Sequence, residues 1–410
     1  MSLPFPHRRR RKQMSAVNEI LAQIGAAGRQ EDGGYFRGCY SPEYFQAVDI
    51  VERQMQKIGM ETDRDAAGNI HGVLPGNDPK AKSVVIGSHL DTVPGGGLYD
   101  GAYGVAAGLA VAKRLREEGK ILRHTLEVYG FHGEESNPLG GTFGSRAIAG
   151  QVKPDQPGLA EALAAYGHNV REILDCRRDF SGVKCYLEAH IEQGDLLEQE
   201  GLKIGVVSGI VSVIRYRVTA LGQSNHAGTT MMKNRRDAMV AMARLIAAAD
   251  EECRKIDDTL VFTVGTIACQ PGSENVIPGR VECTFEMRHM KKEKTDCLIG
   301  RIREIAAGIG TADFEITNKI DKGSVSCDSH LMEVISRSAS EAGICHRIMA
   351  SGAGHDANPM AHVTPIGMIF VPSRGGLSHC KEEWTSQEEL ESGTEVLYRT
   401  VLHLDEEAKE

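Results

Sequence analysis

The chain has 410 residues, more than one hydrophobic core usually organises, so we expect two domains. Its composition, 41% hydrophobic and 25% charged, is that of a globular protein, and no apolar run approaches the roughly 20 residues of a membrane-spanning helix. The formal net charge of -9 argues against a nucleic-acid-binding surface, which leaves small-molecule chemistry as the expected role.

The basic cluster from Arg8 to Lys12 is not followed by an apolar segment, so we interpret it as a solvated tail rather than an export signal. The ten cysteines are scattered between Cys39 and Cys380 without a CxxC pair. This pattern is typical of reduced thiols, and these features together predict a cytoplasmic protein.

Helices and apolar strands alternate from residue 15 to about residue 208, which predicts an α/β sandwich with a largely parallel sheet. The clearest elements are a buried strand at 83–87, an amphipathic helix at 105–118 and a second strand at 125–131. Open α/β sheets bind ligands beyond the carboxyl ends of their strands. The residues that follow these strands are therefore candidates for a site.

A different pattern begins near residue 212 and predicts the order β-α-β-β-α-β of the ferredoxin-like split βαβ unit. Its expected elements are a strand from 212, a helix at 235–256, strands at 259–269 and 281–287, and a closing helix and strand. The first pattern returns near residue 324. We therefore expect a catalytic α/β domain of residues 1–211 and 325–410, interrupted by an inserted α+β lid domain of residues 212–324.

The segment from Gly87 to Gly104 reads GSHLDTVPGGGLYDGAYG, in which a buried strand leads directly into His89, Asp91 and Asp100. Each of these residues alone would suit a solvated turn. Together, in a glycine-rich loop after a strand, they favour a metal site. His89 and Asp91 are two residues apart, so one can face the metal while the other orients the imidazole from behind.

A second signal is GFHGEE at residues 130–135, where the adjacent carboxylates of Glu134 and Glu135 follow an apolar strand. Two buried neighbouring carboxylates repel each other unless a cation is close, so one can bind metal while the other acts as general base. An exposed pair would be an ordinary surface feature. Two further imidazoles follow strand-like stretches, His190 in EAHIEQG and His379 in VPSRGGLSH, although a lone histidine there is more often a core residue.

These residues offer nitrogen and oxygen ligands and no thiolate, which suits two Zn²⁺, Mn²⁺, Co²⁺ or Ni²⁺ ions bridged by Asp100. The candidate ligands are His89, Asp100, Glu135, His190 and His379.

The chain resembles the M20 metallopeptidase clan and, within it, the hydantoinase/carbamoylase family of N-carbamoyl-L-amino-acid hydrolases, allantoate and ureidoglycolate amidohydrolases and β-ureidopropionases. The resemblance covers nearly the whole chain after the basic tail. It rests on motifs in the family's order, GSHLDTVP, YDGAYGV, EE followed by GSRAIAG, EAHIEQG, SNHAGTT, ENVIPG, SGAGHDA and GLSH. The resemblance implies two divalent metal ions per subunit, a small ureido substrate that carries a carboxylate, and a homodimer formed through the lid domain.

The resemblance also implies roles for further residues. Glu134 would be the general base, and Asp91 would steer His89. The implied substrate-binding residues are Gln193 at the pocket wall, His226 in SNHAGTT, Asn275 in ENVIPG, Arg288, and Gly354 in SGAGHDA. In the family, the histidine that matches His226 enters the active site of the neighbouring subunit, where it would stabilise an oxyanion during catalysis. On residue type alone, Arg288 could bind a carboxylate through two parallel hydrogen bonds, or simply lie on a solvated strand face.

Three places depart from the family pattern. Residues 136–140, Ser-Asn-Pro-Leu-Gly, replace the usual Gly-x-Arg-Phe-Gly. Met231 stands where proline is common, and Cys380 stands where asparagine is common. None of these changes removes a candidate ligand, but they leave the choice of substrate open.

We therefore expect a two-metal amidohydrolase that cleaves the ureido C–N bond of an N-carbamoyl-L-amino acid to the amino acid, ammonia and carbon dioxide. Hydrolysis of allantoate or ureidoglycolate is the alternative, and an M20-type dipeptidase is a weaker one. A thiol hydrolase that uses Cys380 beside His379 is disfavoured because adjacent residues rarely face each other as nucleophile and base. A non-catalytic scaffold would not need the complete set of ligands.

Overall fold

The computed structural model describes residues 15–407, so the basic cluster at 8–12 lies outside the described residues. Contacts divide the chain into two units. The first unit holds the chain up to Ser208, Cys327–Met349 and the chain from His355, and the second holds Gly209–Ser326 and Ala350–Gly354. The short segment Ala350–Gly354 was not part of the expected lid range. It joins the second unit through contacts that are distant in sequence, such as the 3.0 Å hydrogen bond from the Val211 N–H to the Ser351 carbonyl.

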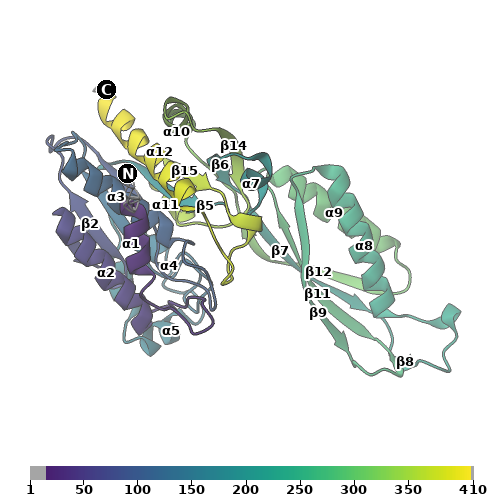
Figure 1. The fold of residues 1–410 in the computed structure, drawn as a ribbon. Coiled ribbons are helices and arrows are strands. Elements are labelled where there is room, and N and C mark those ends of the chain that lie inside the picture. Colours follow the sequence, from purple (N-terminus) through teal and green to yellow (C-terminus); the bar gives the residue numbers. More distant parts are fainter. Residues whose placement is uncertain (1–14, 408–410) are drawn as a thin grey trace, which may run out of the picture. The chain divides into compact units, whose positions relative to one another are not determined.

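A mixed sheet forms the centre of the first unit, with strand order β1-β2-β4-β3-β5-β15-β6 and β14 beside β6 (Figure 1). Its strands are β1 (Glu61–Arg64), β2 (Ile70–Leu74), β3 (Ser83–His89), β4 (Leu126–Phe131), β5 (Val183–Ile191), β6 (Ile204–Ile210), β14 (His346–Ser351) and β15 (Ile366–Val371). The central strands β4, β3, β5 and β15 are parallel, whereas β1, β2 and β6 run antiparallel to their neighbours. The carboxyl ends of the four central strands therefore lie at one edge of the sheet.

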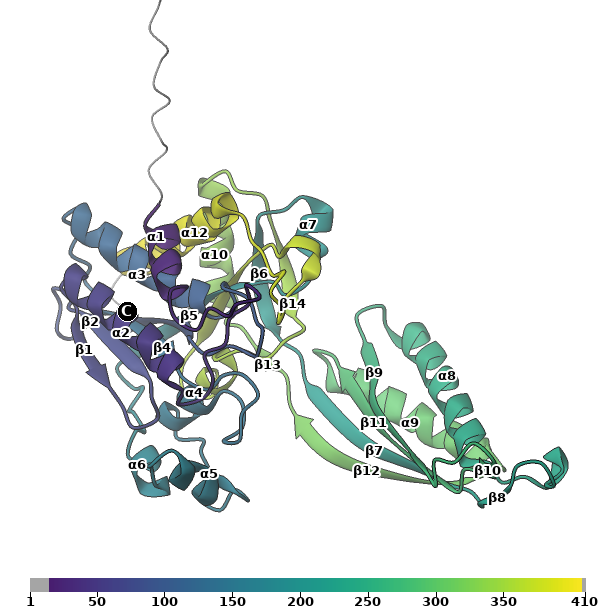
Figure 2. The same cartoon turned by 60° about the horizontal axis from the view of Figure 1, so that its bottom comes forward.

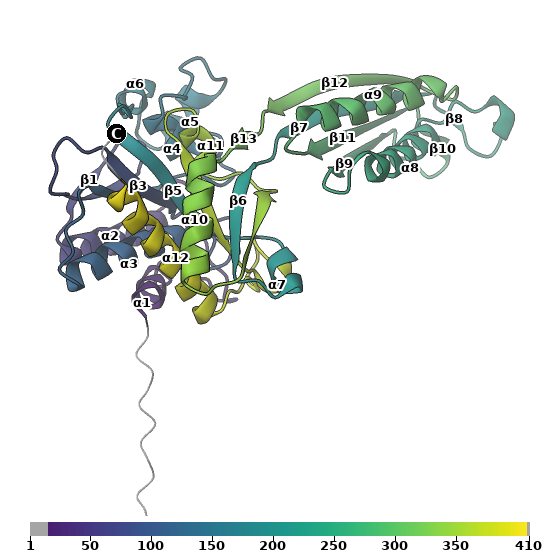
Figure 3. The same cartoon turned by 90° about the horizontal axis from the view of Figure 1, so that it is seen from above.

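Amphipathic helices pack against this sheet. The helices of the first unit are α1 (Ala16–Ile24), α2 (Pro42–Ile58), α3 (Ala102–Glu117), α4 (Phe143–Ile148), α5 (Leu159–Ala165), α6 (Val170–Leu174), α7 (Leu196–Glu200), α10 (Ser329–Glu341), α11 (Ala357–Met360), the 3₁₀ turn η2 (Arg374–Gly376) and α12 (Gln387–Glu406). On α2, Val48, Val51 and Met55 are spaced by three or four residues and are buried, as one face of a helix requires. Figure 3 shows α10 and α12 side by side, and both pack on β15.

The second unit has a four-stranded antiparallel sheet with strand order β12-β7-β11-β9. In chain order its main elements are β7 (Val213–Leu221), α8 (Ala238–Ile256), β9 (Val261–Gln270), β11 (Arg280–Arg288), α9 (Lys292–Gly308) and β12 (Asp313–Lys322). Both helices cover one face of the sheet (Figure 2). Alternate residues of β11, from Val281 to Met287, are buried in the core of this unit. The order is the expected β-α-β-β-α-β.

Details of the second unit differ from the sequence expectation. A two-stranded ribbon of β8 (Asn225–His226) and β10 (Val276–Ile277) extends from the end of the main sheet, and it is too short to leave a period-2 pattern. The short elements η1 (Met232–Asn234) and β13 (Val325–Ser326) were not expected either. Helix α8 begins three residues later than predicted, because the side chain of Asp237 accepts hydrogen bonds from the first free N–H groups of the helix.

The α/β class predicted from the sequence is confirmed, with the parallel arrangement confined to the central strands of the large sheet. None of the helices between residues 15 and 407 combines the length and the apolar character that crossing a membrane requires.

Candidate metal centre

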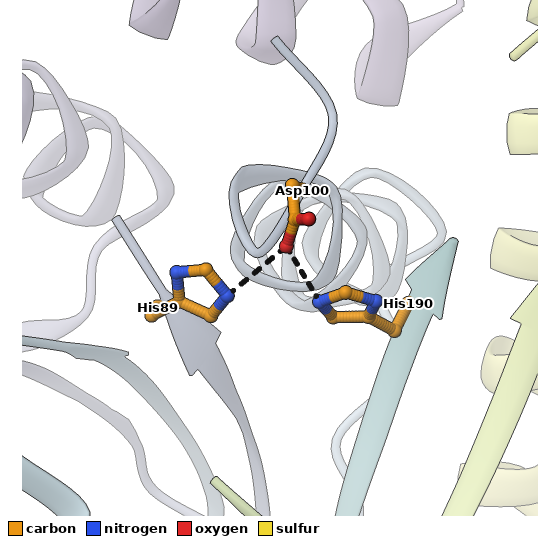
Figure 4. A group of neighbouring side chains, drawn as sticks. All are labelled: His89, Asp100 and His190. Atoms are coloured by element: carbon orange, nitrogen blue, oxygen red, sulfur yellow. Dashed lines mark ion pairs between the residues drawn. The ribbon is translucent and has the colours of Figure 1, made fainter. Parts of the chain in front are cut away.

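The candidate metal ligands gather at the carboxyl ends of the central strands of the first unit. His89 is the last residue of β3, and His190 is the penultimate residue of β5. Asp100 lies two residues before the start of α3, and its carboxylate faces both imidazoles (Figure 4). Glu135 follows β4, and His379 follows β15. Parallel packing of these four strands therefore brings together residues that are almost 300 positions apart.

The first group of candidate ligands consists of His89, His190 and one oxygen of Asp100. The Nε2 atoms of His89 and His190 lie 3.3 and 3.2 Å from Asp100 Oδ1, and all three residues are buried. The Nδ1 atoms lie 3.0 and 2.8 Å from main-chain carbonyl oxygens, those of Asp91 and Ile191. An Nδ1–H that donates to a carbonyl leaves the lone pair on Nε2, where a metal ion can accept it.

The second group of candidate ligands consists of the other oxygen of Asp100, Glu135 and His379. The Nε2 atom of His379 lies 3.4 Å from Asp100 Oδ2 and 3.2 Å from Glu135 Oε1. In each group, ligand atoms lie within 4.8 Å of one another, close enough to share one ion. Asp100 belongs to both groups, so its two oxygens can bridge two ions.

The pKa values of these groups show why a cation suits the centre. Burial lowers the pKa of His89, but the hydrogen bond to Asp100 and the charge of Glu134 outweigh it and raise this pKa well above its usual value. Hydrogen bonds to Asp100 and Glu135 raise the pKa of His379 to about 10. The carboxylates thus favour positive charge on the imidazoles. A divalent ion would supply that charge in place of the protons.

Glu134 lies beside the first group but belongs to neither. Its Oε2 is 3.9 Å from His89 Nε2, which is too long for a hydrogen bond. Burial, followed by the charge of Glu135, raises the pKa of Glu134 well above its usual value, although His89 opposes this shift. A carboxylate with a raised pKa accepts a proton more readily, as a general base must.

Asp91 has a different set of partners from the one expected. Its carboxylate accepts hydrogen bonds of 3.1 Å from the N–H groups of Glu134 and Glu135. The distance from Asp91 Oδ1 to His89 Nδ1 is 3.8 Å, and the imidazole bonds to the Asp91 carbonyl instead. The side chain of Asp91 thus holds the turn that carries both glutamates, while its main chain orients His89.

Gly101 allows the close approach of Asp100 to His89. Its φ is +66°, a left-handed conformation that favours glycine, and a Cβ atom there would lie 2.4 Å from the His89 ring. Two residues with side chains share the left-handed conformation at this centre, Gln193 (φ 59°) and His379 (φ 58°). The Nε2–H of Gln193 donates to Asp100 Oδ2 at 2.7 Å, so Gln193 contacts the bridging carboxylate itself. Strained backbone of this kind is concentrated at functional sites.

The implied substrate-binding residues of the second unit form two clusters. His226 and Asn275 are neighbours, because the Ala227 N–H donates to the Asn275 carbonyl and β8 pairs with β10. Arg288 lies at the other end of the sheet, where it pairs with Glu286 and donates to the Gly352 carbonyl at 2.7 Å. Gly354 belongs to the same segment as Gly352.

The loop at 136–140, which departs from the family pattern, is held by Asn137. Its Nδ2 donates to the carbonyls of Gly133 (2.8 Å) and Glu135 (2.7 Å) and its Oδ1 accepts the Leu139 N–H.

The thiol-hydrolase alternative, in which His379 activates Cys380, is disfavoured by the contacts of His379. Its Nε2 lies beside the carboxylates of Asp100 and Glu135, so this nitrogen is not available to activate the thiol.

Sequence reasoning missed four residues around the candidate ligands: the buried Glu188, Asp356 and Glu383, and the half-buried Ser378. Glu188 accepts hydrogen bonds from Ser88 Oγ at 2.9 Å and from Tyr186 OH at 3.1 Å behind the centre. Ser378 was part of the quoted GLSH motif, but only its neighbour His379 was considered. No signal in the sequence distinguished Glu383 from the exposed Glu382 beside it.

Known proteins that resemble this chain are peptidase-family members and amidohydrolases. The profile of peptidase family M20/M25/M40 matches residues 85–403. The chain is 38% identical over 396 residues to the N-carbamoyl-L-amino acid amidohydrolase of Geobacillus stearothermophilus, covering 94% of this chain and 97% of that protein. It is 35% identical over 398 residues to the allantoate amidohydrolase of Escherichia coli (strain K12), covering 93% and 96%.

Solved structures point to the same family. The crystal structure of a hydantoinase/carbamoylase family amidase from Burkholderia multivorans matches with a TM-score of 0.87 at 30% identity, covering 97% of this chain and 99% of that one. The family inferred from the motifs is confirmed. The chain belongs to the M20/M25/M40 peptidase family and, within it, to the hydantoinase/carbamoylase amidases, which makes it a hydrolase of carbon–nitrogen bonds other than peptide bonds.

Proposed function

We propose that this protein hydrolyses the ureido C–N bond of an N-carbamoyl-L-amino acid and releases the amino acid, ammonia and carbon dioxide. The observation that supports this most directly is the pair of three-residue candidate ligand groups that share Asp100, with Glu134, whose side chain is only 12% exposed, beside them. Relatives named as N-carbamoyl-L-amino acid amidohydrolases, at 34% to 38% identity over nearly the whole chain, support the choice of substrate.

Two divalent metal ions would be held by His89, His190 and Asp100 on one side, and by Asp100, Glu135 and His379 on the other. Nitrogen and oxygen donors without a thiolate fit Zn²⁺ or Mn²⁺, with Co²⁺ and Ni²⁺ as alternatives. Such ions lower the pKa of water and polarise a carbonyl group. Two ions would also offset the repulsion among the clustered carboxylates of the centre.

Glu134 would take a proton from the attacking water and then deliver it to the leaving nitrogen. Water adds to the ureido carbon, the bond from that carbon to the amino-acid nitrogen breaks, and the carbamic acid released decomposes to ammonia and carbon dioxide. Arg288 would bind the substrate carboxylate, and the imidazole of His226 would donate a hydrogen bond to the oxygen that becomes negative. Asn275 and Gly354 would complete the contacts to the substrate.

The positions of Arg288 and His226 within the second unit favour a homodimer. Strand β11 runs from Arg280, near which the β8–β10 ribbon lies, to Arg288, eight residues further along the strand. At about 3.4 Å per residue the two ends of β11 are roughly 27 Å apart, so Arg288 and His226, which lies beyond the Arg280 end, are too far apart to contact one small substrate. A second subunit can supply the missing His226.

The second unit also offers a surface for this pairing. Strand β9 lies at the edge of its sheet, and Val261 and Ile267 on it are 53% and 56% exposed. Val240 on the adjacent helix α8 is 41% exposed. An unpaired, apolar edge strand is a ready site for strand pairing between two copies of the chain.

Allantoate is the second candidate substrate, because relatives at 35% identity are named allantoate amidohydrolases. It presents the same carboxylate and ureido groups to the proposed contacts. Ammonia release should be measured with purified protein and added Mn²⁺ or Zn²⁺ on N-carbamoyl-L-amino acids, N-carbamoyl-β-alanine, allantoate and ureidoglycolate. N-carbamoyl-D-amino acids serve as the matched control. We expect turnover of the L-compounds that chelation removes and metal restores; no turnover of any compound, or turnover that persists without metal, would refute the proposal.

A further inference from the structure

A buried carboxylate outside the ligand groups holds the main chain on which Asp100 lies. Glu383 is buried, and its Oε1 accepts hydrogen bonds from the N–H groups of Tyr99 (2.9 Å) and Asp100 (3.1 Å), more than 280 residues earlier in the chain. Main-chain N–H groups in a loop have no strand or helix partner, so this carboxylate is what satisfies them. The position of the bridging residue thus depends on Glu383.

Ser378 links the same carboxylate to the side chain of Asp100. Its Oγ lies 2.7 Å from Asp100 Oδ2 and 2.9 Å from Glu383 Oε2. Ser378 directly precedes His379, which has the strained φ of 58°, and the Glu383 N–H closes the following turn on the Cys380 carbonyl at 3.1 Å. The segment 378–383 therefore contains one candidate metal ligand, His379, and contacts another, Asp100.

The loop before Asp100 is shaped to admit this carboxylate. A Cβ atom on Gly97 would lie 2.1 Å from Glu383 Oε1, so only glycine lets the main chain pass so close. Neither Glu383 nor Ser378 belongs to the ligand groups. Their contacts are to the residues that present ligands.

We propose that Glu383 and Ser378 form a positioning pair that fixes Asp100 and His379 relative to each other, so that both oxygens of Asp100 can bridge two ions. The inference rests on the proposed two-metal centre. Partners behind metal ligands commonly change metal affinity by ten- to a hundredfold when they are removed. The loss of the pair should weaken the ion held by Asp100, Glu135 and His379 more than the ion held by His89 and His190.

Four variants test the pair. Glu383→Ala removes the acceptor for both N–H groups, and Ser378→Ala removes the link to Asp100. Glu383→Gln keeps one oxygen for the two N–H groups and offers an N–H to Ser378, so it is the conservative rescue. Glu382→Ala, at the exposed neighbouring position, is the matched control.

Zn²⁺ affinity is measured by competition with a chelator, and the geometry of the centre by the visible absorption of Co²⁺-loaded protein. We expect Glu383→Ala and Ser378→Ala to bind one ion about ten- to a hundredfold more weakly and to change the Co²⁺ spectrum. Glu383→Gln should stay within about threefold of the unchanged protein, since its hydrogen bonds can persist. Glu382→Ala should have the same Zn²⁺ affinity and Co²⁺ spectrum as the unchanged protein.

The outcomes separate this inference from the two-metal proposal itself. Fewer than two ions bound by the unchanged protein would refute the two-metal centre. The positioning pair alone would be refuted if the unchanged protein binds two ions and Ser378→Ala binds both of them with the same affinity and the same Co²⁺ spectrum. A Glu383→Gln variant as impaired as Glu383→Ala would refute it too. Near-ultraviolet circular dichroism shows whether Glu383→Ala folds. If it does not fold, the metal affinities and spectra of Ser378→Ala and Glu383→Gln test the positioning pair.

Discussion

Glu134 and Glu135 are adjacent in sequence, yet the fold gives them different surroundings. Glu135 contacts His379 and joins a ligand group, whereas Glu134 lies 3.9 Å from His89 and joins none. We predict that Glu134→Gln lowers the rate of ammonia release by about 10² to 10⁴, the usual contribution of a general base. Metal content, measured by elemental analysis, should stay at the value of the unchanged protein. A Glu134→Gln variant that is fully active would assign the base to another residue.

His132 gives a pH prediction away from the ligand groups. It is fully buried, and its Nε2 accepts the Tyr40 N–H at 2.8 Å while Nδ1 lies 2.7 Å from the Ala67 carbonyl. Both contacts suit the neutral ring. Burial lowers the pKa of His132 from its ordinary value of 6.5 to about 4, so folding favours the neutral form.

The lowered pKa of His132 sets the direction in which the free energy of unfolding changes with pH. The stabilising contribution of His132 is complete above pH 6.5 and is lost as pH falls towards 4, because only the unfolded chain takes up the proton in that interval. Between pH 7.5 and pH 5 the loss is about 2 kcal/mol. Urea unfolding of metal-free protein at both pH values should show this loss, and His132→Gln should reduce it. An equal loss in the variant would contradict the prediction.

Single residues show where sequence reasoning stops. His89, Asp100, Glu135, His190 and His379 could be selected because each follows an apolar or glycine-rich stretch, and the structure gathers them at one sheet edge; their roles as ligands stay predictions. Glu383 could not be selected, since its partners at residues 99 and 100 are recognised only when the chain is folded. The hydrogen bonds from the N–H groups of Glu134 and Glu135 to Asp91 could not be predicted for the same reason.

At the scale of elements, the start of helix α3 sets the distance between the ligands of the first group. Gly101, just before α3, is left-handed, and a side chain there would collide with the His89 ring. We predict that Gly101→Ala destabilises the fold by more than the left-handed strain of about 1 to 2 kcal/mol, and that it also reduces metal content.

Gly119 is the matched control for that substitution. Its φ is also +66°, but a Cβ atom at this position would have no neighbour within 4 Å among the described residues. Gly119→Ala should therefore show the backbone strain without loss of metal. Thermal unfolding and elemental analysis of both variants test this. Equal metal content in Gly101→Ala and the unchanged protein would show that the approach of Gly101 to His89 is not needed for binding.

The elements themselves could largely be predicted, because their apolar patterns are local. The strands β3 and β4, the helix α3 and the β-α-β-β-α-β order of the second unit follow from such patterns. The antiparallel flanks β1, β2 and β6 and the β8–β10 ribbon could not be predicted, since strand direction and short pairings depend on partners far along the chain. The same holds for Ala350–Gly354, which joins the second unit through Arg288 and Val211.

At the scale of the whole molecule, the length of β11 has a consequence for assembly. Arg288 and His226 lie at opposite ends of the second unit, and both are proposed to contact one small substrate. A single chain cannot satisfy this, because the ends of β11, one of which carries Arg288 while the other lies towards His226, are roughly 27 Å apart. The protein should therefore be a dimer whose active sites each combine Arg288 of one subunit with His226 of the other.

We predict that the apolar edge of β9 holds this dimer together. Replacing Val261 and Ile267, both more than half exposed, by lysine should block strand pairing and yield monomers. Light scattering after size-exclusion chromatography measures the mass, and ammonia release should fall with dimer content. A matched control is Ile348→Lys, at a position that is 56% exposed on β14 of the first unit. Dimers that persist in the double variant would place the interface elsewhere.

Mixing two inactive variants tests whether the active site is shared. His226→Ala and Arg288→Ala should each be nearly inactive alone. In a mixed dimer, one site combines the intact Arg288 of the first subunit with the intact His226 of the second, while the other site lacks both. After unfolding and refolding together, half of the dimers are mixed and each has one complete site, so the mixture should recover about one quarter of the activity of the unchanged protein. If both residues served the site of their own chain, every site would lack one of them and mixing would restore nothing.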